Sequence, residues 1–269
     1  MSDRDLNEGF LEMIESFSSA ENLYFHHYKK LALKPFSKPL SLLIDSLLWL
    51  VVKAYNSRAY KKTVEACRMS TTFFLVRHAI KEKAMGDVPI TPKGILQAQS
   101  TARSLCNLPI TTIVTSPLRR AKETAEFIAL NTKLTISEDS RLRERANWGD
   151  LPEQTFDEFV AMWERCTRDP DYIPPVGDNA KQASARLSSL LLELAKIHPP
   201  ESNIVIVTHG GLITDFLVHT FTENQLNVWH PHFVAVQSDL VPECSITKLI
   251  YENGNYKLDV FASVEHLKS

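Results

Sequence analysis

The sequence has few cysteines and no cysteine motif. The four cysteines, Cys67, Cys106, Cys166 and Cys244, lie far apart along 269 residues, and none belongs to a CxxC pair. This spacing disfavours a zinc site or a redox motif, so no metal site is expected. Isolated cysteines are typical of proteins in a reducing compartment, which favours a cytoplasmic location.

A large excess of charge of either sign is also lacking. The formal net charge is −2, and hydrophobic and charged residues make up 44% and 23% of the chain. These fractions are those of an ordinary globular protein, which argues against wholesale disorder. A near-neutral chain does not bind nucleic acid through bulk positive charge, although a local basic pocket is compatible with it. We therefore expect no nucleic-acid partner.

The sequence has no hydrophobic run that clearly predicts a membrane-spanning helix. The apolar segment 39–52, PLSLLIDSLLWLVV, is short and is interrupted by Asp45. Its apolar residues have the spacing of an amphipathic helix. Basic residues follow it, so the range 39–62 could contact a membrane surface, or it could pack on the main domain or on a second copy of the chain in a homodimer. We favour packing, and we expect residues 1–68 to form a helical N-terminal extension to a main domain at 69–269.

From residue 70 onward, strand and helix signals alternate. This alternation predicts a three-layer α/β/α fold with a largely parallel central sheet. A final hairpin is indicated by Asn253-Gly254. Strands are expected at 73–76, 110–114, 134–136, 204–207, 244–251 and 256–262. Helices are expected to begin at Pro92 and at Ser116 and to span 156–165 and 179–197. In the first of these helices, Ile95 is expected on the apolar side.

Two of the expected strands end in histidine. The apolar run 73–76 ends in Arg77 and His78, and the run 204–207 is followed by Thr208, His209 and the glycine pair that begins at Gly210. In open α/β sheets, ligands bind beyond the carboxyl ends of the strands. An arginine can bind an oxyanion, a neutral histidine can attack as a nucleophile, and glycines let backbone N–H groups approach an anion. An ordinary polar turn is the alternative reading of each strand end.

Two further segments carry candidate polar residues. Arg119 and Arg120 lie at a junction of strand and helix, about 100° apart around the helix, so one of them can face the crevice. Glu144 is followed closely by Trp148, and a carboxyl group near an aromatic surface can act as an acid. The alternatives are a solvated arginine pair and a surface ion pair.

Taken together, four segments resemble the histidine phosphatase superfamily, also called the phosphoglycerate mutase-like family. The likeness extends over about residues 71 to 266 and includes the tail. Each segment is modest alone, but four in this order are specific. They read RHA at 77–79, SPLRRAKETA at 116–125, LRERANWGDL at 142–151 and VTHGGLI at 207–213.

The resemblance implies a role for each candidate residue. His78 would form a phosphohistidine, Arg77, Arg120 and His209 would hold the phosphoryl oxygens, and Glu144 would protonate the leaving oxygen. It implies a small phosphorylated substrate and no cofactor. The family usually has glycine after the first histidine, where this chain has Ala79, and its phosphate-contacting asparagine has no match in KEKAMGDVP.

Three readings of the function remain open from the sequence. A phosphomonoesterase is favoured, because no long lid separates Glu144 from His209. A phosphoglycerate mutase and a non-catalytic phosphate-ligand or protein-binding module are the alternatives. Some residues are candidates for the far side of a substrate site, although we favour an ordinary surface or packing role for each of them: Lys81, Lys83, Trp163, Arg165, Arg168, His230 and His232.

Overall fold

The computed structural model describes residues 70–268 of the chain. The expected helical extension at 1–68, including the segment 39–62, lies outside the described residues. No helix within 70–268 is long and apolar enough to cross a membrane.

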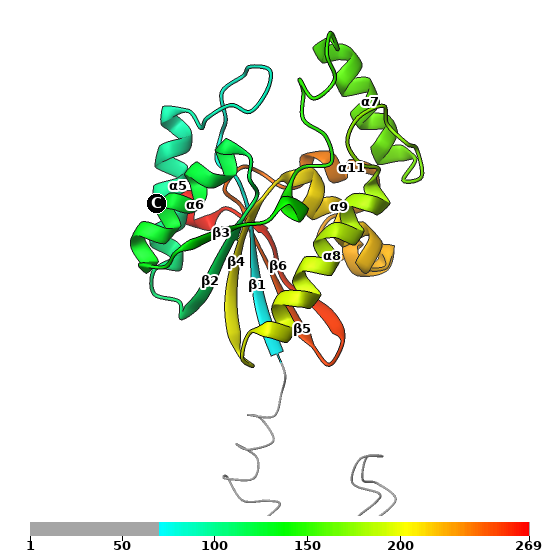
Figure 1. Cartoon of the computed structure of the whole chain (residues 1–269). Coiled ribbons are helices and arrows are strands. Elements are labelled where there is room, and N and C mark those ends of the chain that lie inside the picture. The colour runs from blue at the N-terminus through cyan, green and yellow to red at the C-terminus, as the bar shows by residue number, and fades with distance from the viewer. Residues whose placement is uncertain (1–69, 269) are drawn as a thin grey trace, which may run out of the picture. The chain divides into compact units, whose positions relative to one another are not determined.

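A six-stranded mixed sheet forms the centre of the described chain (Figure 1). The strand order is β3-β2-β4-β1-β5-β6. The first four strands in this order are parallel to one another, and β5 and β6 run antiparallel beside β1. The largely parallel sheet is therefore confirmed. The strands are β1 (Ser70–Arg77), β2 (Ile110–Thr115), β3 (Ile136–Glu138), β4 (Ser202–Thr208), β5 (Ile246–Glu252) and β6 (Asn255–Ser263).

Helices cover both faces of this sheet, which confirms the three-layer architecture. Helices α5 and α6 pack together on one face, and α8 and α9 pack together on the other (Figure 1). The helices are α5 (Pro92–Leu105), α6 (Arg119–Thr132), α7 (Phe156–Arg168), α8 (Ala180–Ile197), α9 (Gly210–Thr220), α10 (Glu223–Asn227) and α11 (Phe233–Val236). Three single turns of 3₁₀ helix are η1 (Ser140–Leu142), η2 (Gln237–Asp239) and η3 (Glu265–Leu267).

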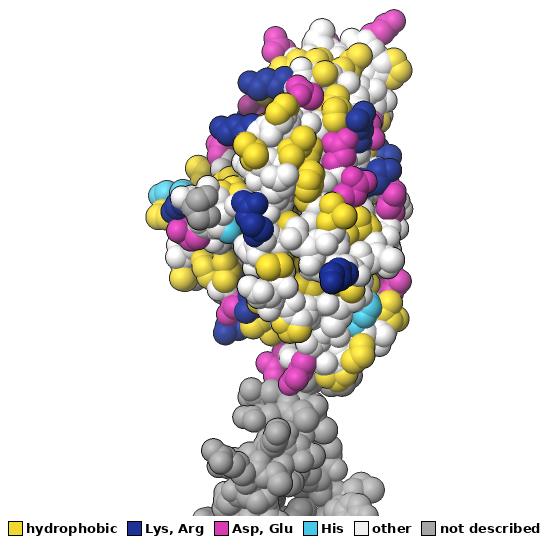
Figure 2. Space-filling model, turned by 90° about the vertical axis from the view of Figure 1, so that its left-hand side faces the viewer, with side chains coloured by type: hydrophobic (Ala, Val, Ile, Leu, Met, Phe, Trp, Pro, Cys, Tyr) yellow, Lys and Arg dark blue, Asp and Glu magenta, His cyan; other side chains and the backbone are white. Residues whose placement is uncertain are grey.

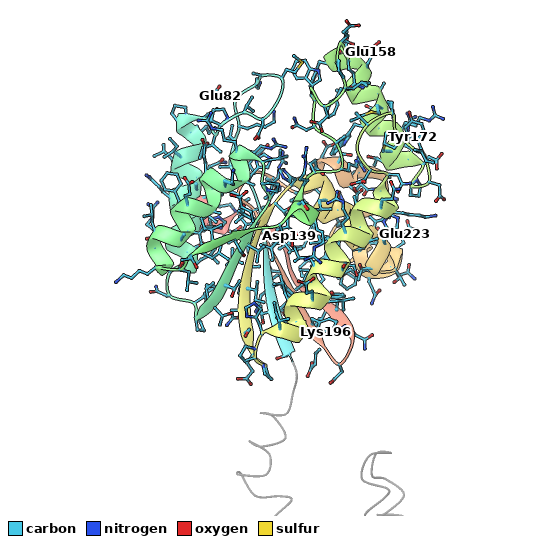
Figure 3. All side chains as sticks on the ribbon, in the orientation of Figure 1. Glu82, Asp139, Glu158, Tyr172, Lys196 and Glu223 are labelled. Carbon is cyan, nitrogen blue, oxygen red and sulfur yellow. The ribbon has the colours of Figure 1, made fainter. Side chains whose placement is uncertain are left out.

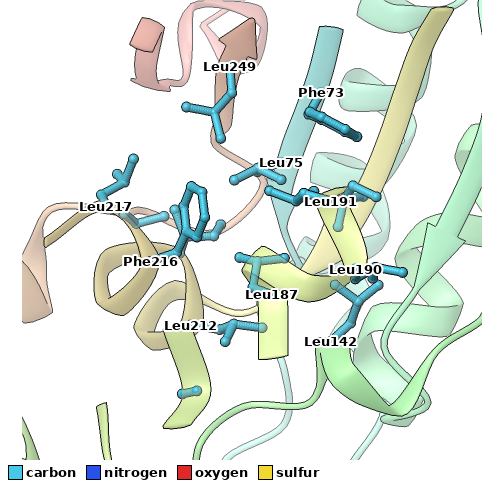
Figure 4. Packing of buried hydrophobic residues seen from close by; sticks show 14 of the residues in the cluster. Phe73, Leu75, Leu142, Leu187, Leu190, Leu191, Leu212, Phe216, Leu217 and Leu249 are labelled. Atoms are coloured by element: carbon cyan, nitrogen blue, oxygen red, sulfur yellow. The ribbon is translucent and has the colours of Figure 1, made fainter. Parts of the chain in front are cut away.

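The apolar run in β1 supplies side chains to both cores. Phe73 and Leu75 pack with α8 and α9, as Figure 4 shows, whereas Phe74 and Val76 pack with α5 and α6. Successive side chains of a strand point to opposite faces, so a strand covered on both faces reads as a continuous apolar run. The surface is mixed by contrast, and basic and acidic side chains are interspersed on the face shown in Figure 2.

Helix starts were predicted well where a capping side chain is present. Thr91, Thr155 and Asn179 each accept a hydrogen bond from a backbone N–H of the first turn of α5, α7 and α8. The start of α6 was predicted too early. The hydroxyl of Ser116 accepts from Leu118 N instead, and the helix begins at Arg119.

Two other details of the prediction were wrong for identifiable reasons. Ile95 was expected on the apolar side of α5 but is 36% exposed. The neighbouring Gly94 faces the protein instead, because it lies against the carbonyl oxygen of Ile80, where a Cβ would be only 2.3 Å from that oxygen. Strand β3 begins at Ile136 rather than at residue 134. Helix α6 ends at Thr132, and the capping residue Lys133 has a left-handed backbone (φ 59°). The next two residues bring the chain beside β2, where β3 pairs with it from Ile136.

Candidate active site

The sheet register brings the two predicted histidines together. Strands β1 and β4 are neighbours, and Arg77 is paired with Thr208 at their carboxyl ends. His78 and His209 each follow one of these paired residues. Their ring centroids lie 5.1 Å apart, with the rings edge to face. Two residues that lie 209 − 78 = 131 positions apart in the sequence thus share one site.

The ring of His78 is held in one orientation by two hydrogen bonds. Nδ1 lies 2.7 Å from the carbonyl oxygen of Ala79, and Arg120 Nε donates to Nε2 over 3.2 Å. A carbonyl oxygen only accepts, so we assign the proton to Nδ1 and the lone pair to Nε2. Burial and the nearby charges of Arg120 and Arg77 hold the pKa of His78 well below 6.5. The ring is therefore neutral, as a nucleophile requires.

Ala79 fits the site without backbone strain. It is fully buried against Ile90, Ala98 and Cys244, and its N–H donates to Thr124 Oγ1 over 3.0 Å. Its φ is not positive, so the position does not need glycine. The methyl group that distinguishes this chain from the family pattern is thus absorbed by packing.

His209 is oriented by a hydroxyl group that the sequence did not single out. His209 is fully buried, and its Nε2 lies 2.8 Å from Ser116 Oγ at the end of β2. If the hydroxyl donates to Nε2, the proton of the ring is on Nδ1. Burial, Arg120 and His78 hold the pKa of His209 well below 6.5. The position of Ser116 directly after a strand was the only signal for this role.

Both buried histidines should make the folded state less stable in acid. Their pKa values in the folded chain lie well below 6.5, the ordinary value that applies after unfolding. As the pH falls through about 6.5, the unfolded chain takes up more protons, so the free energy of unfolding decreases. We expect urea midpoints to fall between about pH 7 and pH 5. The His78→Gln variant should show a flatter dependence, and an unchanged slope would contradict the assignment.

Only one of the adjacent arginines enters the site. Arg120 is 3% exposed and contacts His78, whereas Arg119 points to solvent and pairs with Glu123 at 2.7 Å. The expectation that the two diverge around the helix is confirmed.

Arg77 reaches the site from the end of β1. Its guanidinium is anchored from behind by the Glu243 carboxylate at 2.7 Å and by the Val241 carbonyl oxygen. Both anchors lie on the segment before β5. They leave one face of the group directed toward the cavity that contains His78.

Three buried nitrogen atoms at the site have no hydrogen-bond partner among the described residues. They are Arg77 Nε, Arg120 Nη1 and His209 Nδ1. Buried donors are almost always paired in native proteins, so unpaired donors that lie together are informative. Two guanidinium groups and one ring N–H around the lone pair of His78 suit a phosphoryl group, whose oxygens only accept.

Glu144 is fixed above the histidines by backbone N–H groups. Its Oε2 accepts from Gly211 N over 3.0 Å, and its Oε1 accepts from Arg145 N over 3.0 Å. The carboxylate therefore lies at the N-terminus of α9, where the helix dipole favours negative charge. A Cβ added at Gly211 would meet both Trp163 and Glu144, so the ring of Trp163 lies beside the carboxylate. The sequence had pointed to Trp148 instead.

The two glycines that follow His209 serve close packing. A Cβ at Gly210 would lie 3.3 Å from the Arg77 side chain, and a Cβ at Gly211 would lie 2.6 Å from the Trp163 ring and 2.8 Å from Glu144 Oε1. Gly210 borders the cavity, in agreement with the expected approach of an anion.

We expect Gly211→Ala to lower kcat/KM by roughly tenfold or more, because a displaced general acid loses most of a contribution of about 10²–10⁴. Gly210→Ala should have a smaller effect, since its Cβ would come no closer than 3.3 Å to Arg77. Alanine favours a helix by about 1 kcal/mol over glycine, so a thermal melt should show little loss of stability. Equal activity of Gly211→Ala and the parent would show that Glu144 is placed by other contacts.

A buried ion pair next to Glu144 was not foreseen. Arg145 and Asp215 are each 2% exposed and lie 2.9 Å apart. The Arg145 guanidinium also stacks on Trp163, 3.9 Å from the ring centroid, and donates to Thr167 on α7. Burial raises the pKa of Asp215 to about 7, against the influence of Arg145. The pair ties the Glu144 segment to both α7 and α9.

A cavity of about 780 Å³ opens above His78 and Glu144. Of the residues considered for the far side of a substrate site, Lys81, Lys83 and Trp163 border it. Arg165, Arg168, His230 and His232 do not border it, in line with the ordinary role favoured for them. Arg165 instead stacks on Tyr172, 3.9 Å from that ring centroid. Within residues 70–268, no cluster of three or more histidine, cysteine or acidic side chains could hold a metal ion.

A largely parallel sheet covered by helices, with two histidines and two arginines at its carboxyl edge, defines an α/β protein whose site has the chemistry to bind an oxyanion. A family model provides the more specific assignment. The model for the histidine phosphatase superfamily (branch 1) matches residues 73–263, and the chain belongs to this superfamily.

Individual relatives include proteins named as phosphatases and as mutases. The chain is 33% identical over 150 residues to the uncharacterized phosphatase PhoE of Bacillus subtilis, covering 53% of this chain and 74% of that protein. It is 30% identical over 193 residues to the probable phosphoglycerate mutase GpmB of Escherichia coli, covering 67% and 85%. The solved mycobacterial glucosyl-3-phosphoglycerate phosphatase is similar with a TM-score of 0.58 and 26% identity, covering 72% and 99%.

Proposed function

We propose that the protein is a phosphomonoester hydrolase that works through a phosphohistidine on His78. The observation that carries the proposal is the convergence of the His78 Nε2 lone pair with three unpaired buried donors. Phosphoryl transfer needs positioning and neutralisation of negative charge more than covalent assistance. The superfamily and the phosphatases among the relatives support it.

The first step forms the P–N bond. Arg77 Nε, Arg120 Nη1 and His209 Nδ1 bind the phosphoryl oxygens near the N-terminus of α9. The His78 Nε2 lone pair attacks phosphorus as the P–O bond to the alcohol breaks. The N-terminus of α9 favours the ionised carboxylate of Glu144, so in this proposal Glu144 takes up a proton from the bound phosphate monoanion and gives it to the leaving oxygen. Arg120 Nε donates to Nε2 in the free protein, so this hydrogen bond must be replaced by one to the substrate as the attack begins.

The second step restores the protein. Water attacks the phosphorus of phosphohistidine, the ionised Glu144 accepts a proton from this water, and the electron pair of the P–N bond returns to His78 Nε2. Inorganic phosphate leaves with this proton, and Glu144 is again ionised for the next turnover. The positive charge that the step requires is supplied by Arg77 and Arg120, and His209 adds a neutral donor, so we propose that no metal takes part. Activity should persist in excess EDTA.

Hydrolysis is favoured over mutase chemistry by the chain between Glu144 and His209. This segment consists of α7, α8, β4 and the loops that join them, and α7 borders one side of the cavity. A mutase must protect its phosphohistidine from water, and this segment contains no long lid that would do so.

We also propose a cytoplasmic location. The free thiols of Cys106, Cys166 and Cys244 support a reducing compartment of this kind.

One comparison tests the function. Phosphate release should be measured across sugar phosphates, phosphoglycerates, nucleotides and phosphopeptides, beside isomerisation of 3-phosphoglycerate. Release of phosphate without isomerisation is the expected result. Isomerisation faster than release would favour the mutase, and binding without turnover would favour a non-catalytic module.

We also propose that residues 69–269 form the catalytic unit and that residues 1–68 are an appendage to it. The family match from residue 73 supports this boundary. A chain that begins at Met69 should keep kcat/KM within about twofold of the full chain, because all candidate site residues lie between residues 77 and 211, within the family match. A large loss would show that the N-terminal residues contribute to the site.

A further inference from the structure

The cavity above His78 has two walls of different chemistry. One wall is α7, which contributes Phe156, Phe159, Val160 and Trp163. The other is the segment after β1, which contributes Lys81, Lys83 and Ala84. Figure 3 shows these two segments above the carboxyl edge of the sheet, where Glu158 marks α7 and Glu82 marks the segment after β1.

The apolar residues of α7 have the spacing of a buried helix face but border the cavity. Residues 156, 159, 160 and 163 follow the i, i+3, i+4, i+7 pattern that a core normally covers. Phe156 nevertheless remains 55% exposed. Solvent-exposed aromatic residues that gather in a concave site are typical of ligand contacts.

The aromatic wall is rigidly built. Phe156 packs edge to face on Trp148 at 5.1 Å, and Phe159 lies 6.0 Å from Trp163 between ring centroids. Trp163 is fixed from below by the Arg145 guanidinium at 3.9 Å. Helix α7 itself begins with a complete capping box at Thr155. An ordered apolar surface of this kind costs a ligand little reorganisation on binding.

The opposite wall carries positive charge that the protein does not neutralise. Neither Lys81 nor Lys83 forms an ion pair with any residue of the described chain, although most lysines and arginines near the site do. Lys81 is half-buried, and burial together with Arg120 and Arg77 lowers its pKa. Cations that face a cavity without a carboxylate partner suit a negatively charged group of the ligand.

We propose that the substrate is a phosphomonoester whose alcohol carries an aromatic ring and a second anionic group. The ring would lie on Phe156 and Phe159, and the second anion would lie near Lys81 and Lys83, while the phosphoryl group is at His78. This assignment rests on the proposed function and adds the class of leaving group. Small polar esters without a ring would leave the aromatic wall in water and would be poor substrates.

Three synthetic esters test the proposal because their alcohols have similar reactivity. They are ethyl phosphate, phenylethyl phosphate and para-carboxyphenylethyl phosphate. Burying a phenyl ring should raise kcat/KM of the full-length protein by roughly tenfold or more from the first ester to the second. The added carboxylate should raise it about threefold further at low salt, and this gain should shrink as ionic strength rises.

Variants assign the effect to the two walls. Phe156→Ala, at an exposed position that can be changed without unfolding, should reduce the preference for phenylethyl over ethyl phosphate by roughly fivefold. Phe159→Ala should act in the same direction. Lys83→Met should remove the gain from the carboxylate. Glu164→Ala, on α7 but not bordering the cavity, is the matched control and should alter neither preference.

Two results would overturn the proposal, and they are distinguishable. Equal kcat/KM for ethyl and phenylethyl phosphate, with a phosphohistidine still detected, would reject the substrate class and leave the hydrolase intact. Hydrolysis of none of the esters, with no phosphohistidine formed from any of them, would reject the hydrolase itself.

Discussion

Replacing His78 by alanine is expected to lower kcat by at least about 10⁴-fold, as losses of a covalent nucleophile do. The neutral Nε2 of His78 is the lone pair that faces the unpaired donors, and His209 directs a ring N–H rather than a lone pair to the same place. No other group of the described site can take over the attack. Phosphate release under saturating substrate measures the loss.

Trapping the intermediate makes this test specific. Rapid acid-free quenching after mixing with labelled ester should give one label per chain, stable to base and lost in acid, in the parent but not in His78→Ala. His230→Ala, an exposed histidine that does not border the cavity, is the control and should label normally. Equal labelling of His78→Ala would place the nucleophile elsewhere.

Replacing Glu144 by glutamine should have the next largest effect, and one that depends on the substrate. The glutamine side chain keeps the shape of the residue but cannot give a proton to the leaving oxygen. For alkyl esters we expect kcat/KM to fall by about 10²–10⁴. For nitrophenyl phosphate, whose leaving group needs no proton, the fall should be far smaller.

A series of esters measures this difference as a slope. The logarithm of kcat/KM should depend steeply on the pKa of the leaving alcohol in Glu144→Gln and weakly in the parent, because kcat/KM reports only the step that forms phosphohistidine. Glu164→Gln, on the solvent side of α7, should match the parent. Parallel slopes would mean that another group is the acid. Loss of kcat for all esters would still be expected, since Glu144 also serves the attack of water.

The parts of the site that could be predicted are those that strand ends determine. His78 and His209 could be placed together because both follow apolar runs that only a sheet covered on both faces can bury. Helix geometry indicated only that Arg119 and Arg120 diverge, and the choice of Arg120 followed from the resemblance to the superfamily. The apolar stripe of α7 was visible in the sequence, but the pattern alone cannot say whether a core or a cavity faces it.

Contacts between distant segments could not be predicted in this way. The ion pair between Arg145 and Asp215 joins positions separated by 70 residues. Arg145 is one of several arginines in its segment, and Asp215 is the one acidic residue of an apolar helix, so neither segment identifies its partner. Ser116 gains its role only because β2 and β4 are adjacent. The start of α6 was predicted too early because the Ser116 hydroxyl accepts from Leu118 N, ahead of the helix, and does not cap its first turn.

The hydrogen bond from Arg120 Nε to His78 Nε2 has a consequence for the protein without substrate. While the guanidinium donates to that nitrogen, the reactive lone pair of His78 is less available to other electrophiles. An arriving phosphomonoester competes for Arg120 and thereby uncovers the ring at the moment when a phosphorus atom stands beside it. Reagents that acylate imidazole should modify His78 slowly in the free protein, and more slowly still when a phosphate mimic occupies the same place.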